Sequence, residues 1–315
     1  MRFSRRDFLR ISAGAAGAML VGGCINTPTD LPAYTPPLVR ALLPSITDEV
    51  RLPAFGDWGV HNWNQWGVVQ GLDAASKELG GFHSGLLLGD NFYASGVDSV
   101  EDALFSENFA KLYDTEQLGN LTWHAILGNH DYQGNVEAQI QYTERSGGRW
   151  YMPAHYYRRD FAGASGTLLT VLAIDTDPGF GGWREQLAWL EQQLIALQGA
   201  AQAVVVIGHH TIISYSTHGA TDHLVQYVDP LLRRYRVTAY LCGHDHCLQV
   251  NEDGGVTYAV LGGGGADAYG CGTGPASKFG VSAYGFGVIR ASRGALTLEV
   301  RDNRGKVLYT QTRRV

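Results

Sequence analysis

Long apolar runs and basic charge are both scarce in this sequence. No apolar stretch of 20-odd residues follows the N-terminal segment, so no later segment is expected to span a membrane. The net charge is −6, and the first 23 residues carry a net +3, which leaves −9 on the remainder. A chain this acidic lacks the electropositive surface that duplex nucleic acid requires, so no nucleic-acid partner is expected.

Repeats and heptads are also absent, and the composition is that of a soluble globular protein. Of the 315 residues, 45% are hydrophobic, 17% are charged and 41 are glycine, which leaves enough apolar material for a substantial core. The length alone suggests two domains, but α/β folds of roughly 250 residues are often single domains.

The first 24 residues have the pattern of an export signal. Arg5 and Arg6 precede a mildly apolar run, Ile11 to Gly23, and this pattern resembles a twin-arginine (Tat) signal. The run ends in Leu-Val-Gly-Gly-Cys, which resembles a bacterial lipobox with Cys24 as the lipidated residue, although Gly22 departs from the usual pattern. We therefore expect an exported bacterial protein, periplasmic or anchored to the membrane as a lipoprotein. A short N-terminal membrane anchor with a chance cysteine is the alternative.

Residues 25–50 hold five of the ten prolines, a density that disfavours helix and sheet and predicts an extended tether. The catalytic domain is then expected over residues 51–315, with its first strand near Leu52.

Five short apolar runs are each followed, directly or after one residue, by a glycine and then by a residue that can bind metal. The runs are 52–55, 85–88, 123–127, 203–207 and 237–241, and helical periodicity marks residues 66–79 and 187–197 between them. Strands that alternate with helices predict an α/β fold built from parallel βαβ units, whose functional sites gather beyond the carboxyl ends of the strands. The candidate ligands at these ends are Asp57, Asp90, Tyr93, Asn129, His209, His244 and His246.

The chemistry of this ligand set predicts two metal ions. Seven ligands are too many for one ion, and Asp90 can offer one carboxylate oxygen to each of two. None of the four cysteines belongs to the set, so it is not a structural zinc or iron–sulfur site. A tyrosinate at Tyr93 indicates a strongly Lewis-acidic, trivalent ion, because a phenol with a pKa near ~10 must lose its proton to coordinate.

The motifs at these strand ends resemble those of the purple acid phosphatases in the metallophosphoesterase superfamily, the small tartrate-resistant type above all. The matching blocks are Asp-Trp-Gly at 57–59, Gly-Asp-Asn-Phe-Tyr at 89–93, Gly-Asn-His-Asp at 128–131, Gly-His at 208–209 and Gly-His-Asp-His at 243–246. The resemblance covers most of residues 52–312. It implies a four-layer α/β/β/α sandwich of two mixed sheets and a binuclear centre.

The resemblance also implies a role for each residue. Fe(III) would be held by Asp57, Tyr93 and His246, and a divalent iron, zinc or manganese ion by Asn129, His209 and His244, with Asp90 as the bridge. His130 matches the catalytic histidine of the family, with Asp131 placed to orient it, and His218 matches a second histidine that contacts the substrate or leaving group.

Two departures from the family pattern concern the substrate pocket and its regulation. His210-Thr211 stand where the family commonly has Tyr-Pro, so the pocket contacts differ. The connection from Asp175 to Trp189 is shorter than the regulatory loop of mammalian relatives, so we expect no activation by proteolysis of such a loop.

These residues predict an acid phosphatase acting on a small phosphate ester or a phosphoprotein. A hydroxide on or between the metals would attack phosphorus in line with the ester oxygen, and His130 or His218 would protonate the leaving group. A trivalent ion lowers the pKa of water further than zinc does, which predicts an acidic optimum. We expect a monomer that meets a membrane only through an N-terminal lipid.

Two other functions remain open at this point. The same centre could serve a phosphodiesterase or nucleotide hydrolase, and a protein of a different class could use it for iron redox chemistry or for binding phosphate without hydrolysis. Among the remaining cysteines, Cys242 ends a buried strand and is expected to be inert, whereas Cys247 and Cys271 lie in predicted loops and could pair in an oxidising compartment.

Overall fold

Two mixed β-sheets of seven strands each form the centre of the computed structural model, which describes residues 30–315. The first sheet has the order β14-β13-β12-β1-β2-β3-β4 and the second β11-β9-β10-β8-β7-β6-β5. In the first sheet the strands are β1 (Glu49–Phe55), β2 (Gly85–Leu87), β3 (Trp123–Ala125), β4 (Trp150–Tyr151), β12 (Gly285–Ser292), β13 (Ala295–Asp302) and β14 (Val307–Arg314). In the second they are β5 (Tyr157–Gly163), β6 (Gly166–Ala173), β7 (Ala203–Ile207), β8 (Ala239–Cys242), β9 (Leu248–Asp253), β10 (Val256–Leu261) and β11 (Ser277–Val281).

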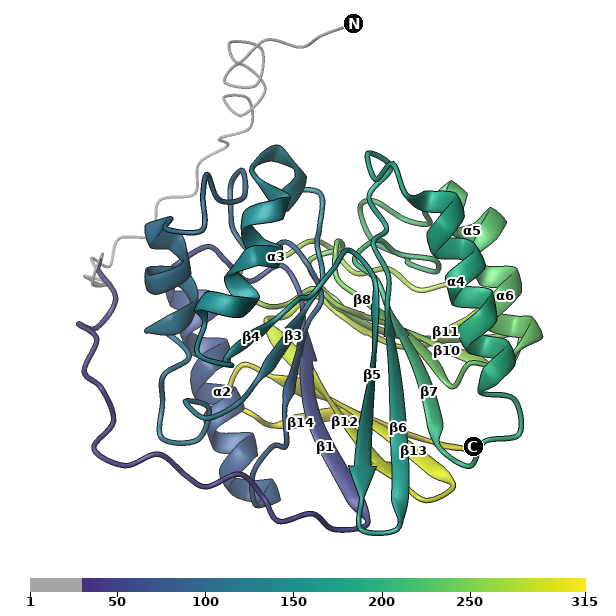
Figure 1. Cartoon of the computed structure of the whole chain (residues 1–315), viewed down its shortest axis with the longest axis horizontal. Helices are drawn as coiled ribbons and strands as arrows, with labels where there is room; N and C mark the ends of the chain where they lie inside the picture. The colour runs from purple at the N-terminus through teal and green to yellow at the C-terminus, as the bar shows by residue number, and fades with distance from the viewer. Residues whose placement is uncertain (1–29) are drawn as a thin grey trace, which may run out of the picture. The chain divides into compact units, whose positions relative to one another are not determined.

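Helices cover the outer face of each sheet, so the expected four-layer α/β/β/α sandwich is confirmed (Figure 1). The first sheet is covered by α2 (Trp63–Leu79) and α3 (Val136–Arg145), and the second by α4 (Trp183–Ala196), α5 (Asp222–Tyr227) and α6 (Asp229–Arg234). Single turns η1 (Phe105–Ala110) and η2 (Asp131–Gln133) lie in the loops.

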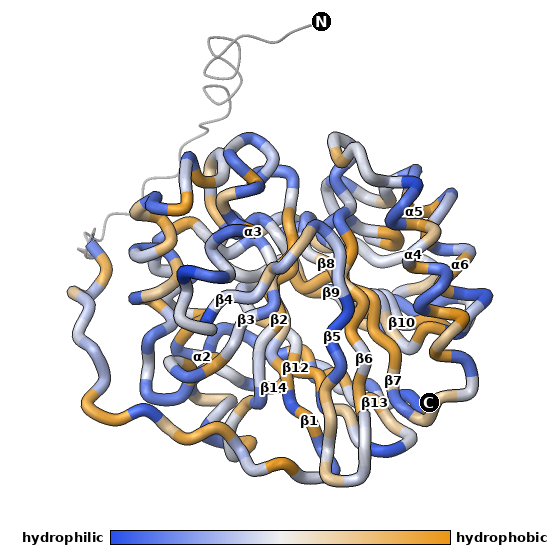
Figure 2. Tube along the Cα trace, in the orientation of Figure 1, coloured by the Kyte–Doolittle hydropathy of each residue, from blue (hydrophilic) through white to orange (hydrophobic). Residues whose placement is uncertain are grey.

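Strand β7 shows why the central strands are continuously apolar. Val205 packs in the core between the two sheets, whereas the next residue, Val206, packs with Leu190 and Leu194 of α4. Successive side chains of a strand point to opposite faces, so a strand covered on both faces needs apolar residues throughout. The hydropathy colouring of β6 and β7 in Figure 2 shows this run.

The predicted parallel units are present in both sheets, but they account for only part of each. Strands β1, β2, β3 and β4 run parallel to one another, and so do β6, β7, β8 and β10. The remaining pairings, β12 with β1 and β13 and β13 with β14 among them, are antiparallel. The sheets are therefore mixed, and their parallel strands bring the five predicted strand ends to one edge of the sandwich.

The first described residues are extended but not free of the domain. No helix or strand occurs in residues 30–48, and residues 33–315 form one compact unit. Arg40 makes two hydrogen bonds of 2.7 Å to the Asp114 carboxylate, and Tyr34 donates a third of 2.6 Å. This part of the predicted tether therefore lies against the domain, whereas the leader (1–24) and residues 25–29 lie outside the described residues.

Among the described residues no helix is both long and apolar enough to cross a bilayer.

Candidate metal centre

Loops at the carboxyl ends of β1, β2, β3, β7 and β8 bring all seven candidate ligands together. Asp57, Asp90 and His246 each place a ligand atom within 4.8 Å of the others, and all three are buried. Parallel strands end at the same edge of a sheet, which explains how residues almost 190 positions apart in the sequence meet here.

One half of the centre surrounds the phenol of Tyr93. The Tyr93 hydroxyl lies 2.9 Å from Asp90 Oδ2, 3.3 Å from Asp57 Oδ1 and 3.2 Å from His246 Nε2. Three oxygens and one imidazole nitrogen therefore converge, which is a hard donor set of the kind a trivalent ion prefers.

The other half surrounds the amide oxygen of Asn129. His244 Nδ1 lies 2.9 Å and His209 Nε2 3.1 Å from Asn129 Oδ1. One neutral oxygen and two imidazoles form a softer set, which suits a divalent ion.

The carboxylate of Asp90 lies between these two halves. Its Oδ2 is the atom that meets the Tyr93 hydroxyl, whereas its Oδ1 is 3.5 Å from His209 Nε2. One oxygen is therefore directed to each ligand set, which is the geometry that a bridge between two ions requires.

Backbone carbonyls fix the orientation of two candidate histidine ligands. His209 Nδ1 lies 2.8 Å from the Leu88 carbonyl and His246 Nδ1 lies 2.8 Å from the Asp267 carbonyl. Each carbonyl accepts the Nδ1 proton, so Nε2 is the nitrogen left for a metal ion and points into the centre.

Three of the candidate ligands adopt a left-handed backbone conformation. Asp57, Asp90 and His244 have φ values of 60°, 50° and 68°. Non-glycine residues rarely adopt this conformation, and such strain concentrates at functional sites. In each case the residue directly follows a glycine at the end of a strand.

Glycines beside the ligands leave room for the opposite loop. A Cβ at Gly128 would overlap Asp90 Oδ1, and a Cβ at Gly243 would overlap Asp57 Oδ2. The glycine-rich stretch 262–265 also packs here, because a Cβ at Gly262 would come within 2.8 Å of Asp57 Oδ2. These glycines are needed for close approach of neighbouring segments.

The electrostatics of the candidate ligands show which of them hold protons that a cation would have to displace. Burial lowers the pKa of His209, but the Asp90 charge outweighs it and raises that pKa to about 10. Burial, together with the charges of Asp57 and Asp90, raises the pKa of Tyr93 well above its usual value. Burial and the neighbouring His209 hold the pKa of His244 well below its usual value. Cation binding therefore has to displace the protons of His209 and Tyr93.

His130 borders the Tyr93 half of the centre. Its ring lies against the Tyr93 ring at 4.3 Å, and its Nε2 is 4.0 Å from Asp90 Oδ2. Its Nδ1 is fixed by the Ala94 carbonyl at 2.6 Å.

The expectation that Asp131 orients His130 is wrong in the observed geometry. The Asp131 carboxylate is fully buried and accepts hydrogen bonds from the backbone N–H groups of Asn91, Phe92 and Gly128 and from Gln139 Nε2. It therefore joins the 89–93 and 128–131 loops to each other, and the ring orientation of His130 comes from Ala94 instead.

His218 borders the opposite half of the centre. Its exposed ring stacks on His244 at 4.2 Å and meets the edge of the Tyr269 ring at 5.5 Å. The two histidines expected to act on substrate thus lie on either side of the candidate ligands, with His130 against Tyr93 and His218 against His244.

His210, at the departure from the family pattern, is buried behind the ligands. Its ring packs on His244 at 4.4 Å, and its Nδ1 is 2.9 Å from Thr176 Oγ1. The same hydroxyl oxygen accepts the backbone N–H groups of His209 and His210. His210 and Thr176 therefore support the ligand loop rather than line an open pocket.

Sequence reasoning gave no role to two residues beside the centre. Tyr269 stacks on the His246 ring at 4.1 Å with an interplanar angle of 12°, and Asp245 hydrogen bonds to the segment that carries His218. For Asp245, its position inside the Gly-His-Asp-His block was the sequence feature that could have indicated a role at the centre. Tyr269 lies in a loop without any motif, so nothing in the sequence marked it.

Comparison with known proteins agrees with this geometry. Residues 54–248 match the family model described as calcineurin-like phosphoesterase. Tartrate-resistant acid phosphatase type 5 of Oryctolagus cuniculus is 37% identical over 243 residues, which cover 69% of this chain and 74% of that protein. Purple acid phosphatase 4 of Arabidopsis thaliana is 29% identical over 292 residues, covering 84% of each chain.

Solved structures support the fold. The inner-membrane-complex anchor GAP50 of Plasmodium superposes with a TM-score of 0.76 at 24% identity, covering 85% of this chain and 89% of that one. A purple acid phosphatase from Lupinus luteus seeds superposes with a TM-score of 0.64 at 18% identity, covering 84% of this chain and 54% of that one. The family match and the identity to the tartrate-resistant enzymes together establish that this chain is a hydrolase of the calcineurin-like phosphoesterase family and belongs to its purple acid phosphatases of the tartrate-resistant type.

Proposed function

We propose that this chain is an acid phosphatase that hydrolyses phosphate monoesters at a centre of one Fe(III) and one divalent ion. The observation that carries the proposal is the position of Asp90, whose two carboxylate oxygens face two different ligand sets. A single-metal site would not need a carboxylate between an oxygen-rich set and an imidazole-rich set.

The donor atoms fit these two ions. Asp57, Tyr93 and His246 would hold Fe(III), and Asn129, His209 and His244 would hold iron, zinc or manganese in the divalent state, with Asp90 shared. The imidazoles of His209 and His246 are oriented by backbone carbonyls, as metal-binding histidines usually are. When bound, the two ions would supply Lewis acidity, which neutralises phosphate charge and lowers the pKa of water.

The residues around the ligands would bind the ester and move its proton. His130 and His218, which border the two halves, can donate hydrogen bonds to phosphate oxygens and hand a proton to the leaving oxygen. Both rings are partly or largely exposed, so they can reach a ligand in solvent. Because a bound trivalent ion would lower the pKa of water further than zinc does, an acidic optimum is expected.

A substrate panel combined with metal analysis tests the proposal. Purified protein should contain two metal ions per chain, and it should hydrolyse p-nitrophenyl phosphate far faster than bis(p-nitrophenyl) phosphate. Preference for the bis ester would instead support the phosphodiesterase alternative. Tight binding of inorganic phosphate with no hydrolysis of either ester would support the non-hydrolytic alternative.

We also propose that the chain is exported by the Tat route and anchored through Cys24. The support is the Arg5-Arg6 pair and the lipobox-like end of the leader. Replacing both arginines by lysine should leave the protein in the cytoplasm. Cys24→Ser should release the exported protein from the membrane fraction, and retention there would contradict the lipid anchor.

A further inference from the structure

Cys247 and Cys271 lie near each other beside the metal centre. Cys247 follows the candidate ligand His246 directly and is fully buried, whereas Cys271 is only partly buried and packs against the same hydrophobic cluster. The side chain of Gln249 lies near both thiols: its Nε2 is 3.1 Å from Cys247 Sγ, and a Cβ at Gly280 would meet Cys271 Sγ at 3.0 Å and Gln249 Cγ at 4.0 Å. Both are free thiols in the structure.

The backbone around Cys271 is built to keep its sulfur in this place. Cys271 Sγ lies 4.0 Å from the carbonyl of Leu248, the residue after Cys247. A Cβ at Gly280, on the neighbouring strand β11, would come within 3.0 Å of Cys271 Sγ, so the lack of a side chain there leaves space for the sulfur. The sulfur therefore occupies a defined niche against β9.

Hydrogen bonds hold the segment that carries Cys271 in register with the His246 loop. The Tyr269 N–H donates to the His246 carbonyl at 2.8 Å, and the Gly272 N–H donates to the Tyr215 carbonyl at 2.7 Å. Ser216 Oγ donates to the Gly270 carbonyl at 2.7 Å. Because these bonds already order residues 269–272, a covalent link between the two cysteines would require little rearrangement.

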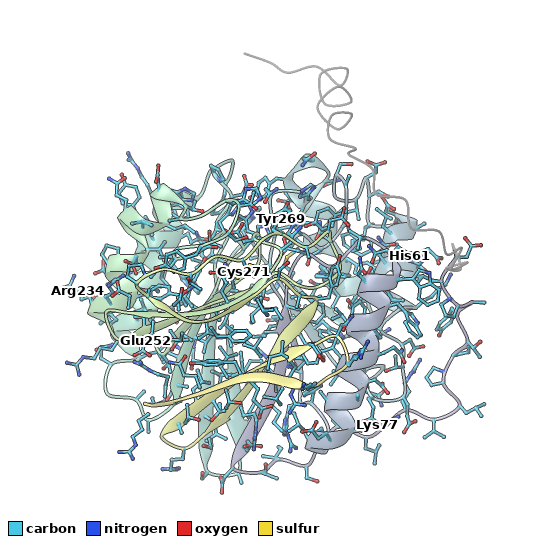
Figure 3. The ribbon with its side chains drawn as sticks, turned by 180° about the vertical axis from the view of Figure 1, so that it is seen from behind. His61, Lys77, Arg234, Glu252, Tyr269 and Cys271 are labelled. Carbon is cyan, nitrogen blue, oxygen red and sulfur yellow. The ribbon has the colours of Figure 1, made fainter. Side chains whose placement is uncertain are left out.

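We propose that Cys247 and Cys271 form a disulfide in an oxidising compartment, and that this bond fixes the Tyr269 segment over the candidate ligand His246. The aromatic ring of Tyr269 covers the His246 ring from this segment, and both Tyr269 and Cys271 are labelled in Figure 3. The bond encloses residues 247–271. Its formation does not depend on the proposed phosphatase activity.

The different accessibility of the two thiols sets the order of the reaction. The more accessible Cys271 loses its proton and attacks a disulfide-bonded oxidant such as oxidised glutathione, forming a mixed disulfide and releasing one thiol. Cys247 then loses its proton and attacks the Cys271 sulfur, which releases the second thiol. Overall, two protons and two electrons pass from the cysteines to the oxidant, which leaves as two thiols.

Burial limits the access of oxidants to Cys247, which is fully buried. Disulfides persist in oxidising compartments and are rare in the reducing cytoplasm, so the pair is expected to stay reduced in the cytoplasm and to close after transfer to an oxidising compartment.

Peptide mapping of the full-length protein after incubation with reduced or oxidised glutathione tests the proposal. The oxidised sample should yield a linked peptide containing Cys247 and Cys271, two hydrogens lighter than the separate peptides. Its Tm should rise by about 5–10 °C over the reduced sample. Cys242, which is buried and donates to the Ala259 carbonyl, serves as the internal control and should alkylate only on unfolding.

Two variants separate the steps. Cys271→Ser should show no reaction at the buried Cys247 and no change of Tm with the redox buffer, whereas Cys247→Ser should trap glutathione on Cys271. Full alkylation of both cysteines in the oxidised wild-type protein, or a glutathione adduct on Cys271 that Cys247 never resolves, would overturn the proposal. Neither readout uses phosphatase activity, so failure of the proposed function would leave this test intact.

Discussion

The carboxylate of Asp245 accepts a hydrogen bond of 2.8 Å from the backbone N–H of His218. Asp245 lies between the candidate ligands His244 and His246, yet its second oxygen accepts the hydroxyl of Ser214 instead of facing the centre. The residue is fully buried. It therefore ties the 214–218 segment to the strand end that carries two ligands, which makes it a positioning residue for His218.

Removing this carboxylate should misplace His218 without removing metal. Asp245→Ala loses both hydrogen bonds, and kcat for p-nitrophenyl phosphate should fall by about 10–100-fold, because small misplacements of a group that acts on substrate are costly. Asp245→Asn keeps one acceptor oxygen and should show a smaller loss. Metal content, measured by elemental analysis, should be unchanged in both variants.

The matched control is Ser214→Ala, which removes the other partner but leaves the bond to His218. This variant should retain most of the wild-type kcat. A loss of metal in Asp245→Asn together with the loss of activity would show that Asp245 acts on the ligands and not through His218.

Asp90→Ala and Tyr93→Phe should separate metal assembly from colour. Asp90 faces both ligand sets, so its removal should deplete both ions and abolish turnover. Tyr93 contributes to one set only, and Tyr93→Phe should remove the tyrosinate-to-iron charge-transfer band while sparing part of the turnover. The measurements are the visible spectrum, elemental analysis and phosphatase activity of each purified variant. A wild-type protein that stays colourless when loaded with iron would contradict the Tyr93–iron assignment.

The parallel half of each sheet could be predicted from sequence because its strands are short apolar runs that end in motifs. The run 203–207 coincides with β7, and the predicted helix at 66–79 begins three residues earlier in the structure, after the Asn62 cap. The antiparallel pairings gave no such indication. Strand β12 pairs with β1 although some 240 residues separate them in the sequence. A local sequence pattern does not identify a partner strand at that separation.

The candidate ligands could be predicted because Asp, Asn, His and Tyr side chains can each bind a metal ion. The contacts that hold these ligands in place could not be predicted. The link between Asp131 and the 89–93 loop, and the bond from Ala94 to His130, depend on the path of the backbone after each strand. The left-handed conformations of Asp57, Asp90 and His244 set that path. A left-handed conformation is hard to predict from sequence when the residue is not glycine.

The stability of the protein should depend on pH through His155. Burial lowers the pKa of His155, but hydrogen bonds to Asp175 (2.7 Å) and Glu137 (3.3 Å) outweigh burial and raise it above 6.5. Tyr132 also donates to the same Asp175 oxygen. Protonated His155 therefore stabilises the folded state fully below about pH 6.5, and this contribution is lost as the pH rises through the raised pKa.

Thermal unfolding of wild type and His155→Gln between pH 5.5 and pH 8.5 measures this contribution. The difference in Tm between the two proteins should be largest at the acidic end and should shrink as the pH rises. Glutamine cannot carry the charge, so the variant should have the flatter profile. A difference that is constant across this range would show that His155 acts only by packing on Phe180.

Gly128→Ala should lower the affinity for metal although it changes no candidate ligand. The added Cβ would overlap both Asp90 Oδ1, the oxygen that faces His209, and the Asp90 backbone nitrogen, so the Asp90 backbone and its carboxylate would have to shift from their position between the two ligand sets. Displacing groups around a metal site typically lowers affinity by about 10–100-fold, and activity at limiting metal should fall accordingly. Gly181→Ala is the matched control, because a Cβ there meets nothing within 4 Å. Addition of excess metal should restore part of the Gly128→Ala activity, and a variant that binds both ions with wild-type affinity would contradict the bridging position of Asp90.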